Sequence, residues 1–214
     1  MDWQTWHNDY DHPNSWMAKR LKDVQQQIKE TLTESPPGQL SIISLCAGQG
    51  RDLLEVLPTH PRRNDIQARL VELDPRNTAI ATAANTPGVE VVTADASWTD
   101  HYLDRTPADL VLLCGIFGNI TDDDIHRTIS FCPQLCKTGG TVIWTRHRDA
   151  PDRVPRICEW FEEIGFERRW LSDQDAEYGV GVHRFTNEPR PLVAGQRMFT
   201  FVGYEALGPG KIGT

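Results

Sequence analysis

The 214-residue chain has no apolar run that approaches the roughly 20 residues of a membrane-spanning helix. Its N-terminal stretch is polar and rich in tryptophan, without the basic and then apolar segments of a secretory signal. Basic residues are also fewer than acidic ones: the chain has 22 lysines and arginines and 30 aspartates and glutamates, which gives a formal net charge of −8. From these absences we expect no membrane span, no secretion, and no nucleic-acid partner held through phosphate contacts.

Cysteine is scarce, and the odd number of five does not suit a disulfide framework. Most of these residues lie within apolar patterns, as reduced core thiols do, so we expect a cytoplasmic protein. Cys132 and Cys136 have a spacing that also occurs in zinc sites, but no second pair of ligands lies nearby in the sequence. We therefore expect core packing for this pair.

Strand and helix patterns alternate after an amphipathic helix at residues 15–34, which ends at a Pro-Pro-Gly breaker. Apolar, β-branched runs predict strands at 40–45, 68–73, 89–93, 108–113, 141–145, 166–171 and 198–204. Helical patterns follow at 52–57, 75–85, 122–135 and 154–164. This alternation predicts a parallel sheet, whereas the last two strands have no helix between them and predict a terminal antiparallel hairpin.

Composition and length both favour one domain, since 39% of the residues are apolar and 24% are charged, as in ordinary globular proteins. We expect an α/β fold with a doubly wound, mostly parallel seven-stranded sheet, a C-terminal antiparallel hairpin and an N-terminal helical extension. Its three regions are a helical cap or lid at 1–37, a ligand-binding core at 38–171, and an irregular loop with a terminal strand at 172–214.

A turn with two glycines, Gly48 and Gly50, directly follows the first expected strand. In open parallel sheets, ligands bind at the carboxyl ends of the strands, beside the point where the strand order reverses. Glycines there let the backbone adopt positive φ and approach a ligand closely. The second expected strand carries Glu72 near its end, and its carboxylate can accept two hydrogen bonds from the paired hydroxyls of a ribose. This combination predicts an adenosine-containing cofactor.

The third position of the glycine fingerprint separates two such cofactors. A dinucleotide site normally has Gly or Ala there so that helix and strand pack closely, but this chain has Leu53. Arg51 and Asp52 also make a bulky helix start, where a pyrophosphate would bind. These residues favour S-adenosylmethionine, and a nicotinamide-dependent oxidoreductase on the same sheet stays the alternative.

Four blocks occur in a characteristic order at residues 44–50, 71–75, 93–97 and 108–115. In these blocks the chain resembles the class I S-adenosylmethionine-dependent methyltransferases, from Leu40 to Leu171 and more loosely to Tyr204. The resemblance implies that the first block surrounds the methionine part of the cofactor, Glu72 binds the ribose, and Asp95 accepts a hydrogen bond from the adenine amino group. The implied cofactor contacts are Cys46, Ala47, Gly48, Gly50, Glu72, Leu73, Asp95, Ala96, Cys114 and Gly115.

The segment after the fourth strand, 114–119, lacks the Asn/Asp-Pro-Pro-Tyr/Phe signature of family members that methylate nucleic-acid amino groups. Together with the acidic net charge, this favours a small-molecule methyl acceptor. The acidic run 122–124 immediately precedes a helical pattern, so helix capping explains it better than metal binding does. We predict no metal site.

Basic and imidazole side chains follow the fifth expected strand, at the sheet edge where a substrate would enter. His147 is the candidate general base, because an unperturbed pKa near 6.5 suits proton removal around neutrality. Arg146 or Arg148 can clamp a carboxylate or phosphate of the substrate. A solvated loop with surface ion pairs is the alternative for this segment. His183 is a weaker candidate for the same cavity.

Aromatic residues near the N-terminus, Trp3, Trp6 and Tyr10, together with His7, fit either a lid that excludes water or simple packing on the domain edge. The sequence indicates the residues that bind a cofactor more clearly than any residues that would bind a methyl acceptor. A third hypothesis therefore stays open, in which the protein binds an adenosyl cofactor without catalysing a reaction.

Overall fold

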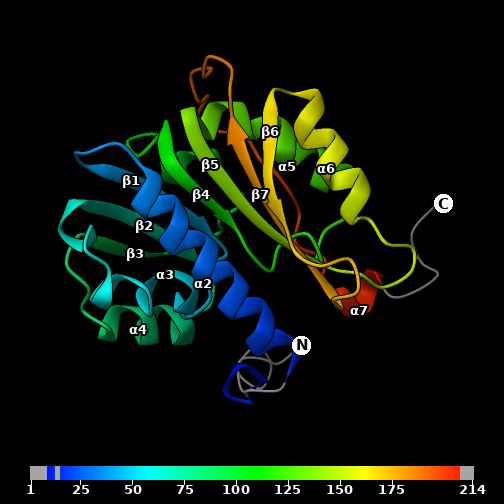
Figure 1. Ribbon diagram of the computed structural model, residues 1–214, viewed down its shortest axis with the longest axis horizontal. Coiled ribbons are helices and arrows are strands. Elements are labelled where there is room, and N and C mark those ends of the chain that lie inside the picture. Colours follow the sequence, from blue (N-terminus) through cyan, green and yellow to red (C-terminus); the bar gives the residue numbers. More distant parts are fainter. Residues whose placement is uncertain (1–8, 13–14, 208–214) are drawn as a thin grey trace.

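The computed structural model describes residues 9–12 and 15–207. Within them, seven strands form one sheet in the order β3-β2-β1-β4-β5-β7-β6 (Figure 1). β1 to β5 are parallel, whereas β7 is antiparallel to both β5 and β6. The strands are β1 (Leu40–Leu45), β2 (Ile66–Glu72), β3 (Val89–Thr93), β4 (Ala108–Leu113), β5 (Cys136–His147), β6 (Phe166–Leu171) and β7 (Tyr178–Phe185). The expected α/β fold, with its mostly parallel sheet and C-terminal hairpin, is confirmed.

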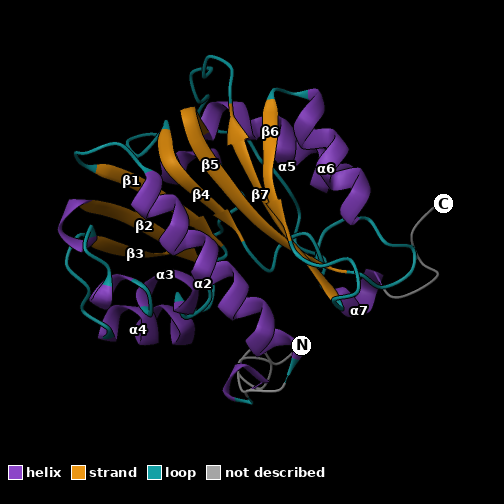
Figure 2. Ribbon diagram, in the orientation of Figure 1, coloured by secondary structure: helices purple, strands orange, loops and turns teal. Residues whose placement is uncertain are grey.

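Helices cover both faces of this sheet (Figure 2). They are α2 (Trp16–Glu34), α3 (Arg51–Leu54), α4 (Pro75–Ala83), α5 (Asp122–Leu135), α6 (Val154–Glu163) and α7 (Tyr204–Leu207). Short 3-10 turns are η1 (Asp9–Asp11), η2 (Leu57–Thr59), η3 (Arg63–Asp65) and η4 (Thr99–Tyr102). No helix in the described part of the chain combines the length and apolarity that crossing a bilayer requires.

Local sequence sets where the helices begin. α2 follows Ser15, whose hydroxyl accepts a hydrogen bond from the Ala18 amide at 3.0 Å. α4 follows Asp74, which caps the helix through its carboxylate, and Pro75 fits the first turn because no partner is needed for an amide there. The helix expected at 52–57 is shorter: α3 ends at Leu54, and η2 follows it.

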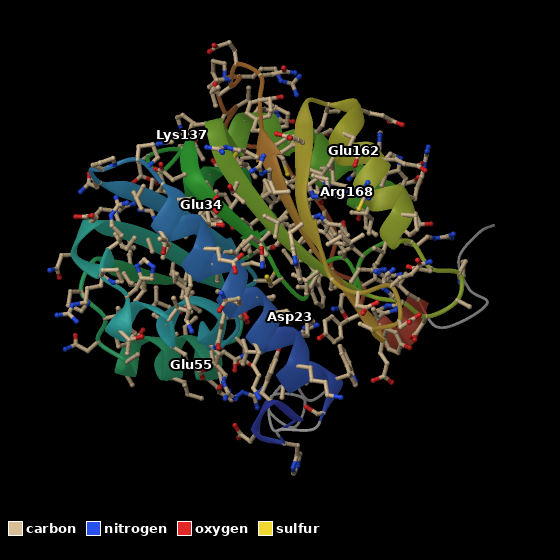
Figure 3. The ribbon with its side chains drawn as sticks, viewed as in Figure 1. Asp23, Glu34, Glu55, Lys137, Glu162 and Arg168 are labelled. Atoms are coloured by element: carbon tan, nitrogen blue, oxygen red, sulfur yellow. The ribbon has the colours of Figure 1, made fainter. Side chains whose placement is uncertain are left out.

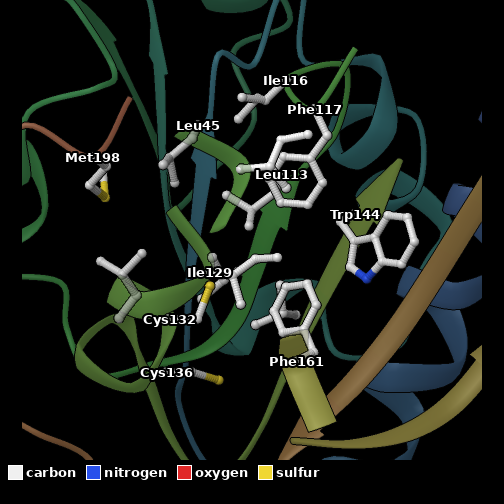
Figure 4. Packing of buried hydrophobic residues seen from close by; sticks show 14 of the residues in the cluster. Leu45, Leu113, Ile116, Phe117, Ile129, Cys132, Cys136, Trp144, Phe161 and Met198 are labelled. Atoms are coloured by element: carbon white, nitrogen blue, oxygen red, sulfur yellow. The ribbon is translucent and has the colours of Figure 1, made fainter. Parts of the chain in front are cut away.

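Two apolar layers hold the helices on the sheet, since neighbouring strand residues point to opposite faces. On one face, Trp144 of β5 packs against Phe117 and Phe161, with ring centroids 6.0 and 6.3 Å apart (Figure 4). The adjacent Ile143 belongs to the other layer, where it joins apolar side chains such as Ile28 of α2. Each of these five side chains is fully buried.

Polar contacts add ties between helices and the antiparallel end of the sheet. The Tyr178 hydroxyl of β7 donates to the Asp23 carboxylate of α2 at 2.9 Å, and Figure 3 labels Asp23 on that helix. Arg168 of β6 pairs with Glu162 of α6 at 3.4 Å, and Figure 3 labels both residues. This second pair is exposed, so it contributes little to stability.

The prediction of a strand at 198–204 is wrong. The antiparallel partner of β6 is β7, which lies within the segment 172–196 that the sequence indicates as an irregular loop. Residues 198–203 have no regular structure, and α7 begins at Tyr204. The C-terminal region therefore contains a strand that lies between β5 and β6, followed by an irregular segment.

β7 and β5 are difficult to recognise in the sequence because they contain glycines, which close packing requires at these positions. A Cβ atom on Gly179 would lie 2.4 Å from Val154 Cγ2, and one on Gly181 would lie 2.3 Å from the Trp144 ring. β5 begins at Cys136 instead of at the expected residue 141 for a similar reason, since a Cβ on Gly140 would come within 2.8 Å of a backbone carbonyl oxygen of β4. Glycine at these positions is a packing requirement and does not end the strand.

Candidate functional site

A cavity of about 270 Å³ opens at the carboxyl ends of β1, β2 and β4, where the strand order reverses. Nine of the ten predicted cofactor contacts line it, all but Gly50. The lining residues are Tyr10, Cys46, Ala47, Gly48, Gln49, Arg51, Asp52, Glu72, Leu73, Asn77, Asp95, Ala96, Cys114, Gly115, Phe199 and Phe201. The fold thus brings three separate predicted blocks, and the end of a fourth, to one place.

The turn after β1 has an unusual backbone. Cys46, Gly48 and Gly50 all have positive φ, at 49°, 56° and 72°. The Ala47 amide donates to the Val71 carbonyl at 3.0 Å, which joins this turn to the end of β2. The turn therefore presents its backbone to the cavity.

Gly50 does not line the cavity, contrary to its expected role as a cofactor contact. It is the residue before α3, and a Cβ there would lie 2.7 Å from both Leu54 Cδ1 and Leu70 Cδ2. Its lack of a side chain allows α3 to pack closely on β2. The physical role of this glycine is in packing.

Glu72 is held in one orientation by two backbone amides. The Gly48 amide donates to its Oε2 atom at 2.8 Å, and the Asp74 amide donates to Oε1 at 2.9 Å. Each carboxylate oxygen can accept more than one hydrogen bond, so both keep acceptor capacity toward the cavity. Leu73, the next residue, is 67% exposed at the rim.

Asp95 combines a turn role with access to the cavity. The Ser97 amide donates to its Oδ1 atom at 3.0 Å, which is the local contact that Asp often makes in turns. Its Oδ2 atom lies 3.5 Å from the Arg197 guanidinium, and the side chain is 41% exposed. The carboxylate is therefore fixed by its own turn and still able to accept from a ligand.

The two thiols of the cavity are neutral groups. Burial raises the pKa of Cys46, and the carboxylates of Glu72 and Asp95 raise it further. Burial also raises the pKa of Cys114, with Asp52 acting in the same direction. Neither thiol has the lowered pKa of a nucleophilic cysteine.

Gly115 connects this cavity with a second one of about 420 Å³, because it lines both. The Gly115 amide donates to the Thr145 hydroxyl at 2.8 Å, and its carbonyl accepts from the Asn119 amide group at 2.8 Å. The second cavity is lined by Trp16, Arg20, Gly115, Gly118, Asn119, Thr145, Arg146, His147, Asp149, Glu177 and Tyr204. Both predicted catalytic residues, Arg146 and His147, are among them.

His147 is neutral at pH 7, because burial and the neighbouring Arg146 lower its pKa to about 4. Its Nε2 atom contacts a terminal nitrogen of Arg146, so Nε2 acts as the acceptor and the ring proton lies on Nδ1. Nδ1 is 3.3 Å from the Asp149 carboxylate, and the ring meets Tyr204 edge-on at 5.0 Å. The lone pair that a general base needs is thus directed at Arg146.

The other basic candidates lie elsewhere. Arg148 does not line the cavity, since its guanidinium donates to Asp152 at 2.8 Å and to the Tyr178 carbonyl at 3.2 Å. His183 is fully buried in the core, where its Nδ1 atom accepts from the Trp144 indole at 3.1 Å. Burial lowers the pKa of His183 to about 3. Its role is structural.

The acidic run after β4 serves the fold. Asp122 pairs with Arg153 at 2.8 Å, and Asp124 pairs with Arg127 at 2.9 Å. Asp124 also accepts from the Thr200 amide at 2.8 Å. Among residues 9–12 and 15–207, no group of three or more His, Cys, Asp or Glu side chains is arranged to hold a metal ion.

Comparison with known proteins identifies the fold. No family model matches the chain, and no curated protein matches it. Among solved structures, the CurJ carbon methyltransferase is 15% identical with a TM-score of 0.62, and the match covers 78% of this chain and 54% of that one. The N-methyltransferase NodS from Bradyrhizobium japonicum, in complex with S-adenosyl-L-homocysteine, is 14% identical with a TM-score of 0.60 over 84% of this chain and 93% of that one.

A TehB-like S-adenosylmethionine-dependent methyltransferase from Corynebacterium glutamicum is 18% identical, with a TM-score of 0.56 over 86% of this chain and 95% of that one. The chain has a methyltransferase fold. It spans only about half the length of two of the similar proteins: the match covers 54% of the CurJ chain and 56% of an O-methyltransferase family protein from Burkholderia thailandensis.

In this methyltransferase fold, the C-terminal segment forms a wall that the sequence did not predict. Phe199 and Phe201 line the first cavity, and Tyr204 lines the second. The Met198 amide donates to the Ser97 carbonyl at 2.8 Å, which anchors the segment to the turn that follows β3. The apolar run 198–204 is the signal in the sequence for this wall, although its composition is also that of a strand.

Asn119 anchors the other end of this wall. Its side-chain oxygen accepts from the Tyr204 amide at 3.0 Å, and its carbonyl accepts from the Val202 and Gly203 amides at 2.9 and 3.0 Å. The Tyr204 hydroxyl donates to Asp149 at 2.5 Å. The segment therefore bridges both cavities.

The N-terminal residues lie partly outside the description, since Trp3, Trp6 and His7 belong to the undescribed residues 1–8. Tyr10 lines the first cavity, and its hydroxyl accepts from the buried Arg20 guanidinium. Asp11 pairs with Arg51 at 2.9 Å. One aromatic residue of this stretch thus contributes to the cavity wall.

Proposed function

We propose that this protein is an S-adenosylmethionine-dependent methyltransferase that acts on a small-molecule acceptor. The observation that carries the proposal is the convergence of the glycine turn, Glu72 and Asp95 on one cavity at the switch point of a methyltransferase fold. The similar structures with this fold include carbon, oxygen and nitrogen methyltransferases, and one of them holds S-adenosyl-L-homocysteine.

The chemistry of the donor set fits an adenosyl cofactor. Glu72 has a fixed carboxylate with remaining acceptor capacity, which suits the two hydroxyls of a ribose. Asp95 and residues 46–48 line the same cavity. Asp95 is the proposed acceptor for the adenine amino group, and the turn at 46–48 is the proposed contact for the amino-acid portion. When bound, S-adenosylmethionine supplies a methyl group activated by a sulfonium.

The acceptor belongs in the second cavity, because Gly115 at the end of β4 is shared by both. Methyl transfer requires the two reactants in near-attack geometry, so the main task of the protein is positioning. Thr145 and Asn119 fix the Gly115 backbone for this purpose. Arg146 and His147 are the proposed acceptor-side residues, and His147 can act as a base once Arg146 leaves its Nε2 lone pair.

Cysteine chemistry supports a further part of the proposal, a cytoplasmic location. All five cysteines of the described chain are free thiols, and three of them are buried. Such residues suit a reducing compartment.

Calorimetric titration of the full-length protein tests the cofactor assignment. S-adenosyl-L-homocysteine is expected to bind, whereas NAD is not, and binding of NAD alone would favour the oxidoreductase alternative. Glu72→Gln should weaken S-adenosyl-L-homocysteine binding by at least about tenfold, or roughly 1.4 kcal/mol, because it removes a charged acceptor.

A matched control is available on the neighbouring strand. Glu90 of β3 also accepts hydrogen bonds, but from Arg69 and Arg105 outside the cavity. Glu90→Gln should leave the affinity for S-adenosyl-L-homocysteine within about twofold of the wild type. Equal affinities of the Glu72 variant, the Glu90 variant and the wild type would remove the ribose role of Glu72.

A further inference from the structure

Arg146 is a buried cation that lacks a carboxylate partner. It is 6% exposed, and none of the ion pairs in the described residues includes it. Its Nε atom is buried and has no hydrogen-bond partner there. Burial lowers the pKa of this guanidinium, as expected for a cation taken out of water. A buried charge without a partner is costly, so the site is poised for an anion.

The acids that could neutralise Arg146 are engaged elsewhere. Asp122 is paired with Arg153 at 2.8 Å, and Asp149 accepts the hydrogen bond of the Tyr204 hydroxyl at 2.5 Å. The Asp149 side chain is also 53% exposed, and Glu177 at the same cavity is exposed as well. The negative charges of the second cavity therefore lie toward solvent, while the Arg146 cation lies inside.

Within the described part of the chain, the side chain that forms a hydrogen bond with the Arg146 guanidinium is the neutral His147. This contact uses a single terminal nitrogen, which leaves the Nε edge of the guanidinium for another acceptor. The planar fork of arginine matches the two oxygens of a carboxylate. Trp16 and Tyr204 line the same cavity and offer aromatic surface to the rest of such a ligand.

We infer that the second cavity binds a small organic carboxylate, with the carboxylate on Arg146 and the acceptor atom toward Gly115. This inference rests on the proposed function for the identity of the reaction, although the anion site itself does not depend on it. A monoanion fits better than a phosphate dianion, because Asp149 and Glu177 at the same cavity repel a second negative charge.

Binding of a matched pair of probes to the full-length protein tests the inference. Benzoate and its neutral analogue benzamide are titrated into the protein alone and into the protein with excess S-adenosyl-L-homocysteine, with ligand-observed NMR as the readout. Benzoate is expected to bind at least about tenfold more tightly than benzamide, a difference of roughly 1.4 kcal/mol. Equal binding of the two would overturn the inference, and tighter binding of phenyl phosphate than of benzoate would overturn the carboxylate assignment.

Variants locate the site. Arg146→Gln should weaken benzoate binding by at least about tenfold, whereas Arg146→Lys, which keeps the charge but loses the fork, should weaken it by about threefold. Arg148→Gln is the matched control, because Arg148 is a nearly buried arginine close by in the same chain segment that does not line the cavity. Benzoate affinity that is unchanged in Arg146→Gln, or reduced equally in Arg148→Gln, would contradict the assignment.

Affinity for S-adenosyl-L-homocysteine, measured on the same samples, separates the two proposals. A protein that distinguishes benzoate from benzamide but does not bind S-adenosyl-L-homocysteine would refute the proposed function and retain the anion site. A protein that binds S-adenosyl-L-homocysteine without distinguishing the probes would refute only the carboxylate inference. If Arg146→Gln does not fold, the wild-type probe pair and Arg146→Lys decide the question.

Discussion

Mild acid is expected to destabilise this protein through two histidines that fold as neutral rings, the buried His183 and the half-buried His147. His183 has no exposed surface and stacks on Phe161 with ring centroids 4.8 Å apart. Burial lowers the pKa of His183 to about 3, and burial with Arg146 lowers the pKa of His147 to about 4. An unfolded histidine titrates near 6.5.

The sign of the effect follows from proton uptake. Below about pH 6.5 the unfolded chain binds protons at these positions that the folded protein does not bind, so stability is full above that pH and decreases as the pH falls. At pH 5 the unfolded pKa lies about 1.5 units above the solution pH, and each unit is worth about 1.36 kcal/mol. Each histidine therefore costs about 2 kcal/mol between pH 7 and 5, and the pair costs about 4 kcal/mol.

Urea unfolding at pH 7 and pH 5 measures this loss. The variant His183→Asn keeps an acceptor oxygen for the Trp144 indole but does not titrate, so it should lose about 2 kcal/mol between the two pH values where the wild type loses about 4. The comparison uses the change with pH, and the lower absolute stability expected from altered packing does not affect it. An equal loss in both proteins would show that neutral burial of His183 is not the cause.

Two further predictions concern the packing of α3 on β2 and the C-terminal wall of the cavities. Gly50→Ala should lower the free energy of unfolding by about 2 kcal/mol, because the added methyl group overlaps two leucines and the φ of 72° is strained for alanine. The control Gly195→Ala has a φ of 70° but open space around it, so it should cost only about 1 kcal/mol. Equal losses of the two variants in urea unfolding would exclude the packing role of Gly50. Asn119→Ala should cost about 1–2 kcal/mol and speed hydrogen exchange of the Tyr204 amide, and unchanged exchange would show that the C-terminal wall does not depend on this side chain.

Much of the fold could be predicted because the parallel core is locally encoded. The strands at 40–45, 89–93 and 108–113 have the predicted bounds. The first and third are buried parallel strands with continuous apolar runs, whereas 89–93 is a partly buried edge strand whose valines indicate it. The start of α4 was equally readable, because Asp74 and Pro75 carry their own capping chemistry. Position relative to these strands was enough to bring Gly48 and the two carboxylates to one edge of the sheet.

The antiparallel end could not be predicted in the same way. β7 contains glycines that usually indicate a turn, and only the Val154 and Trp144 side chains packed against them explain why. Residues 198–204 have the composition of a strand, but their amides donate to acceptors in loops and in the first turn of α5, which are distant in sequence. Local propensity has no information about such partners.

The sequence by itself determined the parallel core, the helix starts and the place where a cofactor site forms, because short apolar runs, caps and glycines act within a few residues. The tertiary structure alone decided what His147 and Arg146 can do. Burial makes one ring neutral and leaves one guanidinium without a carboxylate, and burial depends on what the rest of the chain places around a residue.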